Sequence, residues 1–274
     1  MVTAFANYDR CIEICQSQGF AGIEVANLHM RGLTRYYQSD LIGGLEDSMT
    51  GAEGAARAGK HREEMLSHGS SGNILWEMGE FEAARSQSEA ALKLAHRLGS
   101  RNMEPFQLIF LALNLMAEDH RAEAAQLACK AVEISCSTET GPSLVGPWAL
   151  GAVAATSDDH EQRRRALEEG ERLLGPDCVS HCHLWFYRLA MDASLKCADW
   201  EGAEHYASGL EAFTIIEPLP WSDFFIARAR VLVAHERNKH DEATRQGLER
   251  LHGQAERARF VVAKRALDQA LNSS

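Results

Sequence analysis

The chain has 274 residues, of which 45% are hydrophobic and 24% are charged, and its formal net charge is −11. This apolar content argues against disorder, and an acidic chain without a dense Lys/Arg run argues against a nucleic-acid or anionic-membrane surface. No apolar run reaches the ~20 residues of a membrane span, and the N-terminus lacks the order of a signal peptide. Seven irregularly spaced cysteines, an odd number, indicate reduced thiols in a cytoplasmic protein.

Residue usage favours helix throughout the chain. Alanine is abundant and only 6 prolines interrupt the sequence, and alanine loses no side-chain entropy in a helix. The segment 81–95 places small and apolar residues at helical spacing with charged residues opposite. Because no run shows strand-like alternation, the sequence predicts an all-α fold.

Internal repetition is the strongest pattern. Gly19, Gly59 and Gly99 lie 40 residues apart, and each closes a helical segment, as a left-handed C-terminal cap would. Small residues recur at the same interval, apart from one interval that is a residue short of two periods, at Ala4, Gly44, Ala84, Ala124, Ala203 and Ala243. The short interval predicts a deletion near 174–178, in a unit where Arg164 takes the small-residue position.

The period corresponds to one helical hairpin, because two helices of ~15–18 residues and two short turns need about 40 residues. Stacked hairpins bury one another's faces and form a superhelix. We therefore expect one helical-repeat domain over 1–274, a right-handed α-α superhelix of about six hairpins. Its expected units are a half repeat 1–20, hairpins 21–60, 61–100, 101–139, 140–178, 179–217 and 218–258, and a C-terminal helix or tail 259–274.

The second hairpin carries residues that resemble the tetratricopeptide signature, namely Gly72, Leu75, Gly79, Phe81, Ala84 and Ala91. The 40-residue period exceeds the usual 34 of that family and the closing proline is missing. Both departures resemble the longer repeats of bacterial signal-transduction ATPases.

A second resemblance concerns the latter half of the chain. The segments 181–188, 199–200 and 217–228 are similar to the C-terminal repeat region of class III adenylate/guanylate cyclases, which carry a cyclase domain and an AAA-type ATPase ahead of the repeats. The resemblance implies a non-catalytic sensor or scaffold region that alters cyclic-nucleotide output through upstream domains. A free-standing tetratricopeptide adaptor is the alternative interpretation.

The start of the chain aligns with second helices of the repeat. Residues 3–18 carry an apolar stripe of Phe5, Tyr8, Ile12 and Cys15 without a first helix to cover it. Because helical arrays need a polar terminal cap, we expect a C-terminal fragment of a larger protein.

Three sequence patterns resemble a phosphate-binding loop, a reactive thiol pair and a metal site, but each has a simpler structural explanation. Gly54 to Lys60 fits a phosphate-binding loop, but His61 replaces the required Ser or Thr and no strand precedes it. The Cys11–Cys15 pair has apolar neighbours that indicate buried thiols. A Cys/His cluster has ligands suited to Zn²⁺, yet packing or capping is the favoured interpretation of Cys178, His181, Cys182 and His183. We therefore expect no metal, no cofactor and no catalytic site, with a metal-dependent enzyme as the least favoured alternative.

With these sites set aside, the remaining predicted function is recognition of a partner. First helices of such arrays line a concave face, and residues at i, i+4 and i+7 point into it. These side chains could hold a protein or peptide, or could instead pack within the array or on upstream domains. The expected groove residues are His29, Leu33, Tyr36, Asn73, Trp76, Ile109, Leu113, Met116, Arg188, Asp192, Arg228, Leu232 and His235. The oligomeric state stays open.

Overall fold

The computed structural model describes residues 2–237 and 241–273. Within these ranges the elements are α1 Val2–Gln18, α2 Ala21–Tyr37, α3 Leu41–Arg57, α4 His61–Glu77, α5 Phe81–Arg97, η1 Arg101–Met103, α6 Glu104–Ala117, α7 Arg121–Cys136, α8 Gly141–Leu144, α9 Gly146–Thr156, α10 His160–Leu173, α11 Ser180–Lys196, α12 Trp200–Thr214, α13 Pro220–Glu236, α14 Glu242–Ala258 and α15 Val261–Asn272. No strand occurs among the described residues.

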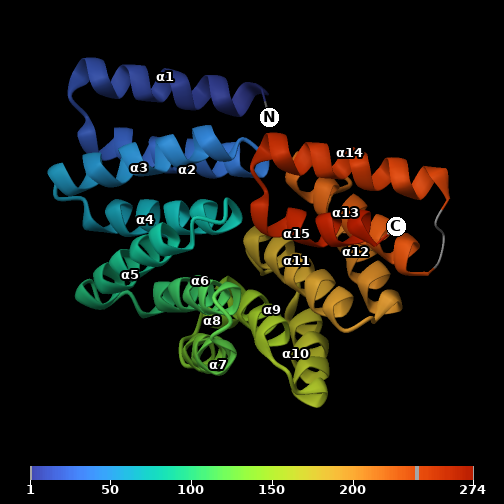
Figure 1. Ribbon diagram of the computed structural model, residues 1–274. Helices are drawn as coiled ribbons and strands as arrows, with labels where there is room; N and C mark the ends of the chain where they lie inside the picture. The colour runs from blue at the N-terminus through green and yellow to red at the C-terminus, as the bar shows by residue number, and fades with distance from the viewer. Residues whose placement is uncertain (1, 238–240, 274) are drawn as a thin grey trace.

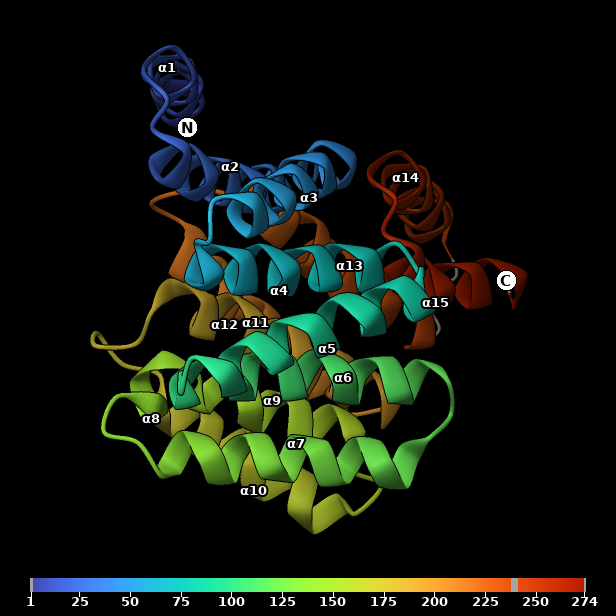
Figure 2. The same ribbon diagram turned by 90° about the vertical axis from the view of Figure 1, so that its left-hand side faces the viewer.

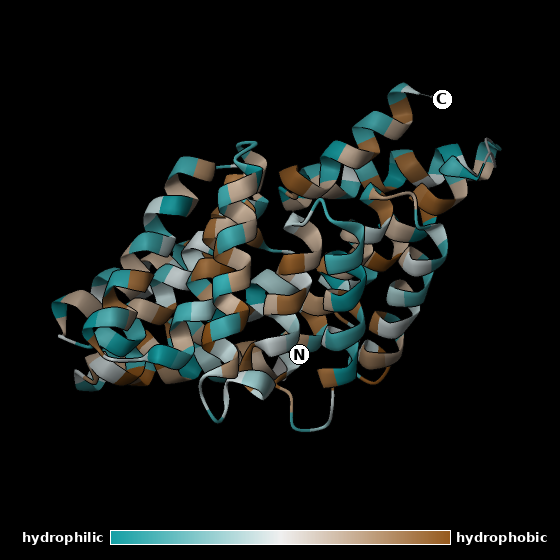
Figure 3. Cartoon of the chain, turned by 90° about the horizontal axis from the view of Figure 1, so that it is seen from below, coloured by the Kyte–Doolittle hydropathy of each residue, from teal (hydrophilic) through white to brown (hydrophobic). Residues whose placement is uncertain are grey.

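The helices pack as six successive antiparallel hairpins, from α2–α3 to α13–α14 (Figures 1 and 2). The first helices α2, α4, α6, α9, α11 and α13 also contact one another in series, and α15 continues that series. The predicted all-α, right-handed superhelix of about six hairpins is confirmed. Hydrophilic and hydrophobic residues are interspersed along the helices (Figure 3). In the described part of the chain, no helix has the length and apolar character to cross a membrane.

The superhelix winds far enough for its two ends to meet. Helix α13 contacts α2, and α15 contacts α4, although these pairs lie far apart in the sequence. Figure 1 accordingly shows α14 and α15 beside the first hairpins. The inner surface made by the first helices is therefore largely filled by side chains from opposite halves of the molecule.

The turns repeat a left-handed backbone conformation at fixed positions. Gly19, Gly59 and Gly99 have φ between +63° and +72°, as the repeat pattern predicts for caps between hairpins. Turns within hairpins use the same conformation at Gly79, and at non-glycine residues such as Ser39 and Asp119. Helices α1 to α6, α11 and α14 are each followed within two residues by such a position, where the chain turns.

Small residues mark the places where paired helices cross. Ala84, Ala124 and Ala203 are fully buried. Two predicted members of that series lie elsewhere: Ala243 is exposed, and Arg164 is exposed and paired with acidic neighbours on α10. These two second helices are rotated relative to the repeat register, so that Thr244 on α14, and Ala166, Leu167 and Gly170 on α10, are buried instead.

Glycine and serine meet at several of these crossings. A Cβ on Gly72 would lie 2.6 Å from Ser88 Oγ and 3.1 Å from the backbone oxygen of Ala84. Gly32 faces Ser48 in the same way, 40 residues earlier in the chain. The absence of a side chain at these glycines sets how closely the two helices of a hairpin approach.

This contact predicts an unusual result for a glycine-to-alanine change. In a helix interior, Gly→Ala ordinarily stabilises by about 0.5–1 kcal/mol. Gly72→Ala should instead destabilise by about 1–3 kcal/mol, because the new methyl group overpacks the α4–α5 crossing. Urea unfolding gives the difference.

The matched control is Gly253→Ala in α14, where the nearest atom to a new Cβ is the flexible tip of Arg257 at 3.4 Å. That variant should be more stable than the parent. A gain in stability from Gly72→Ala would show that the α4–α5 crossing accommodates a methyl group and would contradict this prediction.

Candidate functional site

A pocket of about 230 Å³ opens between the first helices of the superhelix. Its walls come from α2, α4, η1, α6, α8, α9 and α11, so that five hairpins contribute to one cavity. The lining residues are His29, Leu33, Tyr37, Leu66, Gly69, Ser70, Asn73, Met103, Phe106, Gln107, Phe110, Leu144, Trp148, Val179, His181 and Trp185. None of them is Asp, Glu, Lys or Arg.

The pocket has a half-buried apolar rim and a buried floor. Six partly exposed side chains form the rim: Leu33, Leu66, Met103, Phe106, Leu144 and Val179. On the floor, Trp148 and Trp185 stack with ring centroids 4.9 Å apart, and the edge of Phe110 meets both indoles. Aromatic walls around a few polar groups are typical of ligand pockets.

The polar groups of the floor are uncharged near neutral pH. Burial, together with the nearby His181 and Arg62, lowers the pKa of His29 to about 4. Burial also lowers the pKa of His181, whose Nδ1 lies 2.7 Å from the hydroxyl of Tyr37. His29 Nδ1 lies 3.4 Å from Ser70 Oγ.

Amide groups complete the floor. The side-chain amide of Gln107 lies over Gly69, where a Cβ would approach its Nε2 to 2.7 Å. Four buried atoms of the floor residues have no hydrogen-bond partner in the described structure, namely Asn73 Oδ1, Gln107 Oε1, Trp148 Nε1 and Trp185 Nε1. Such atoms are costly to bury unless something else satisfies them.

Of the expected groove residues, His29, Leu33 and Asn73 line this pocket. Tyr36, Trp76 and Ile109 are at most 5% exposed and belong to the hydrophobic core. Leu113 and Leu232 are buried in the same core, whereas Met116 is half-buried against it and His235 is buried with its Nε2 3.2 Å from Ser273 Oγ. These residues pack within the array because the superhelix closes on itself.

Tyr36 and the charged residues of the expected set form a buried polar junction between the two halves. The Tyr36 hydroxyl accepts a hydrogen bond from Trp221 Nε1 at 3.0 Å and donates one to Glu77 at 3.4 Å. Burial raises the pKa of Glu77, and the positive charge of Arg188 opposes that rise. Burial lowers the pKa of Arg188 to about 10, although the negative charge of Glu77 acts to raise it.

Asp192 holds the two arginines of this junction. It pairs with Arg188 and, at 2.8 Å, with Nη1 of Arg228. Arg228 also donates from Nε to the carbonyl of Ala263, and the guanidinium of Arg188 lies 3.8 Å from the centre of the Phe225 ring. The junction therefore links α4, α11, α13 and α15.

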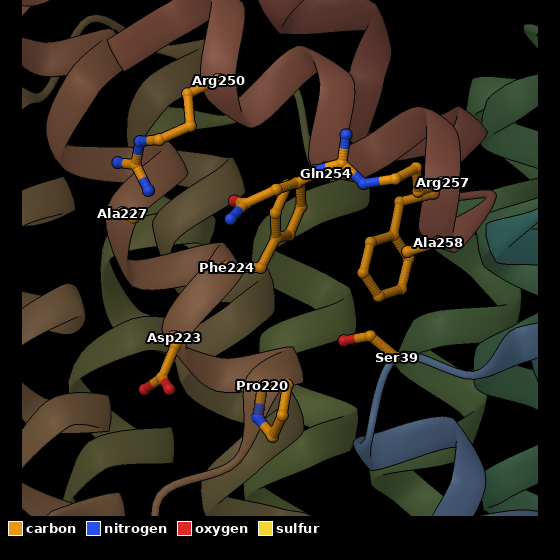
Figure 4. Close-up of a pocket in the computed structure, with 10 residues that line it drawn as sticks. Ser39, Pro220, Asp223, Phe224, Ala227, Arg250, Gln254, Arg257 and Ala258 are labelled. Atoms are coloured by element: carbon orange, nitrogen blue, oxygen red, sulfur yellow. The ribbon is translucent and has the colours of Figure 1, made fainter.

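Two further cavities lie near the C-terminal hairpins. One of about 500 Å³ is bordered by Asp192, Arg228 and Leu232 of the expected set. The other, of about 430 Å³, lies between α13 and α14 (Figure 4). In it Arg250, Gln254 and Arg257 of α14 lie over Phe224, and Ser39 of the α2–α3 turn closes one end.

The four side chains of the Cys/His cluster have separate contacts. Cys178 and Cys182 donate from Sγ to the carbonyls of Leu173 and Leu144, each at 3.2 Å. His181 turns toward Tyr37, whereas His183 stacks on Phe213 at 4.2 Å. Among the described residues, no group of three His, Cys, Asp or Glu side chains is arranged to hold a metal ion.

The other two candidate patterns are helical. Residues 54–60 form the end of α3 and a turn, with Gly59 as the cap. Cys11 is exposed and Cys15 buried on α1. Residues 54–60 therefore do not form a phosphate-binding loop, which requires a strand before the glycines.

Most of the pocket floor lies outside the positions that the sequence predicts. Phe106 and Phe110 are one turn apart and lie one turn before Ile109 and Leu113, the positions expected from the repeat register. Trp148 and Trp185 belong to two hairpins for which the repeat register predicts only Arg188 and Asp192 as groove residues. The signal available was the spacing of large aromatic residues on successive first helices.

Comparison with solved structures identifies the class of fold. The chain superposes on the crystal structure of a Rap protein complexed with competence and sporulation factor, with a TM-score of 0.64 over 92% of this chain and 74% of that one. Sequence identity is 11%. No family model matches the chain, and no curated protein matches it in sequence. The fold is thus that of a tetratricopeptide-like helical-repeat protein.

The buried histidine predicts a loss of stability in acid. Unfolded His29 takes up a proton near pH 6.5, whereas folded His29 does so only near pH 4. As pH falls through this window the unfolded state binds more protons, so the free energy of unfolding decreases, by about 3 kcal/mol from this residue. His29→Gln should flatten the pH dependence of urea unfolding between pH 6.5 and 4.

His120→Gln, at an exposed turn position, is the control and should leave the slope unchanged. Identical slopes for the parent and His29→Gln would contradict the buried, neutral state of His29.

The buried junction predicts a second effect. Asp192→Ala leaves two buried arginines without their carboxylate and should cost about 3 kcal/mol or more in urea unfolding. The matched control is Asp158→Ala, since Asp158 also contacts two cations, Arg121 and Lys196, but is 65% exposed. That variant should lose less than about 1 kcal/mol, and equal losses would show that the junction is not specially coupled.

Proposed function

We propose that this chain is a non-catalytic protein-interaction and regulatory module whose pocket, lined by α2, α4, α6, α9 and α11, receives a segment of a protein or peptide partner. The observation that carries the proposal is the pocket itself: a half-buried apolar rim around a buried polar floor, built by five hairpins. Apolar anchors entering such pockets supply most of the energy of protein recognition. The similar Rap structure is itself a complex with competence and sporulation factor, which supports a recognition role.

The wider setting of the module is also a proposal. We infer from the resemblance of 181–188, 199–200 and 217–228 that it forms the C-terminal sensor or scaffold region of a bacterial adenylate/guanylate cyclase-type signalling ATPase in the cytoplasm. Binding in the pocket would then alter cyclic-nucleotide output through upstream domains. The reading frame around the coding sequence tests this setting, because a cyclase domain in the same polypeptide supports it. A frame that holds the repeats alone favours the free-standing adaptor.

A metal-dependent enzyme is the least supported alternative. The Cys178 and Cys182 thiols point to different backbone carbonyls, and His181 contacts α2. Reaching a shared metal would require each side chain to give up its present contact.

Peptide selection tests the recognition role directly. We expect peptides selected by phage display against this chain to lose at least tenfold in affinity for Leu33→Glu, because the new carboxylate places an uncompensated charge at the apolar rim. Calorimetric titration of the selected peptides gives the affinities.

Met30→Glu is the matched control, one turn away on the same helix and 45% exposed. It should bind like the parent. Selected peptides that bind Leu33→Glu and the parent equally would overturn the assignment of the pocket.

A further inference from the structure

The first helices of the superhelix leave apolar side chains uncovered. Among the described residues, nine large hydrophobic side chains are exposed, and four of them lie on α1, α2 and the turn between them, namely Ile14, Phe20, Ile23 and Met30. None of the nine lies on α13, α14 or α15, at the other end of the array. Apolar side chains gathered at one end of a helical array mark an interaction surface, because an end that faces water carries a polar cap.

The uncovered side of α1 differs from the side that the apolar stripe predicted. Helix α1 packs on α2 and stands at the edge of the array (Figures 1 and 2). Ile12 and Cys15 of the stripe are buried there, whereas Cys11 and Ile14 stay exposed. The open side of α1 is therefore a second side of the helix, next to the one that contacts α2.

The next hairpin shows what this second side ordinarily contacts. Gly51 and Gly54 of α3 are the equivalents, 40 residues later, of Cys11 and Ile14. A Cβ on Gly54 would lie 2.9 Å from Val25 Cγ1, and one on Gly51 would lie 3.6 Å from the backbone oxygen of Val25. Both positions thus face α2, the first helix of their own hairpin. Cys11 and Ile14 occupy the positions against which a first helix would pack.

The exposed side of α2 gives the same result. Met30 corresponds to Ser70 of α4, whose Oγ lies 3.4 Å from Nδ1 of His29 on the preceding first helix. Ile23 lies seven residues before Met30 and so projects from nearly the same side of α2. Ile23 and Met30 therefore point to the place of a first helix before α2.

Together the open sides of α1 and α2 form what we call the N-terminal face, made of Cys11, Ile14, Ile23 and Met30. A helix that fits this face runs antiparallel to α1, as the two helices of each hairpin do. A two-fold axis perpendicular to α1 supplies such a helix from a second copy, namely α1 itself. The same apolar side chains of the two copies are then removed from water together.

The charges beside the face suit a second copy. Arg10 and Glu13 are both exposed on α1 and carry opposite charges. Reversal by the two-fold axis exchanges their order, so the base of each copy comes beside the acid of the other. Charges of a single sign on α1 would instead make the face repel its own copy.

We propose that the N-terminal face is the interface of a two-fold dimer, in which α1 of each copy lies antiparallel to α1 of the other and covers Ile23 and Met30. The pocket is formed within one copy, so this assembly is separate from the proposed recognition role.

Sedimentation equilibrium of the whole chain tests the interface. The parent should form a dimer, and Ile23→Glu should raise the dimer dissociation constant at least tenfold, because each copy brings an uncompensated carboxylate into the interface. The fold accepts this residue, since Glu63 stands at the equivalent position of the next hairpin.

The matched control is Ile42→Glu on α3, since Ile42 is 51% exposed and Ile23 is 57% exposed, but Ile42 lies outside the N-terminal face. It should dimerise within twofold of the parent. A parent chain that stays monomeric at every concentration would overturn the proposal and leave the face to a helix of another protein. Equal dimerisation of Ile23→Glu and the parent would overturn it as well.

The thiol of Cys11 reports on the same interface. Near the two-fold axis, the Cys11 side chains of the two copies lie close together, so a short bismaleimide should join them in a covalent dimer. Cys129 is also exposed, but it lies on α7. Cys129→Ser should therefore crosslink like the parent, whereas Cys11→Ser should give no covalent dimer. Crosslinking of Cys11→Ser to the same extent as the parent would contradict the antiparallel α1 pair.

Discussion

The hydrogen bond from the indole of Trp221 to the hydroxyl of Tyr36 joins residues 185 positions apart, and the closed shape of the superhelix depends on the buried cluster around it. Both side chains are completely buried, and Tyr36 also lies parallel to Trp185. A helical array that winds back on itself must fill its axis, and large rings from α2, α11 and α13 do so here. Because opposite halves supply these rings, folding of the two ends is coupled through one contact region.

The charges beside these rings make the closure specific as well as strong. Glu77 comes from the N-terminal half, whereas Arg188 and Arg228 come from the C-terminal half. Buried ions are unfavourable unless their partners are in place. A shift of one helical turn between the halves would separate Glu77 from the arginines and would move Tyr36 away from Trp221. The polar cluster therefore fixes the register in which the ends of the superhelix meet.

These long-range contacts explain how far the sequence could predict the structure. The caps at Gly19, Gly59 and Gly99 and the crossing at Ala84 follow from local rules, so the hairpins could be predicted from their spacing. The pocket could be predicted only in part: His29, Leu33 and Asn73 followed the repeat register, but α6 enters after a 3₁₀ turn and presents Phe106 and Phe110 in place of Ile109 and Leu113. The burial of Tyr36 and Trp76 could not be predicted, because it depends on hairpins more than 100 residues away meeting α2 and α4.

Unpartnered polar atoms occur in the described structure both at helix crossings and in residues that line the pocket. The hydroxyls of Ser48 and Ser88 lie at helix crossings opposite Gly32 and Gly72, where only a small side chain fits, so close packing accounts for them. Asn73 and Gln107 line the pocket, but their unpartnered oxygens are themselves closed to solvent, and the Gln107 amide packs against Gly69 of α4. A partner segment in the pocket would contact α4 and α6 of the N-terminal half and, through Trp185 and His181, α11 of the C-terminal half. Occupation of the pocket would thus add a second link between the halves that Tyr36 and Trp221 already join, which gives binding a physical route to the stability of the whole superhelix.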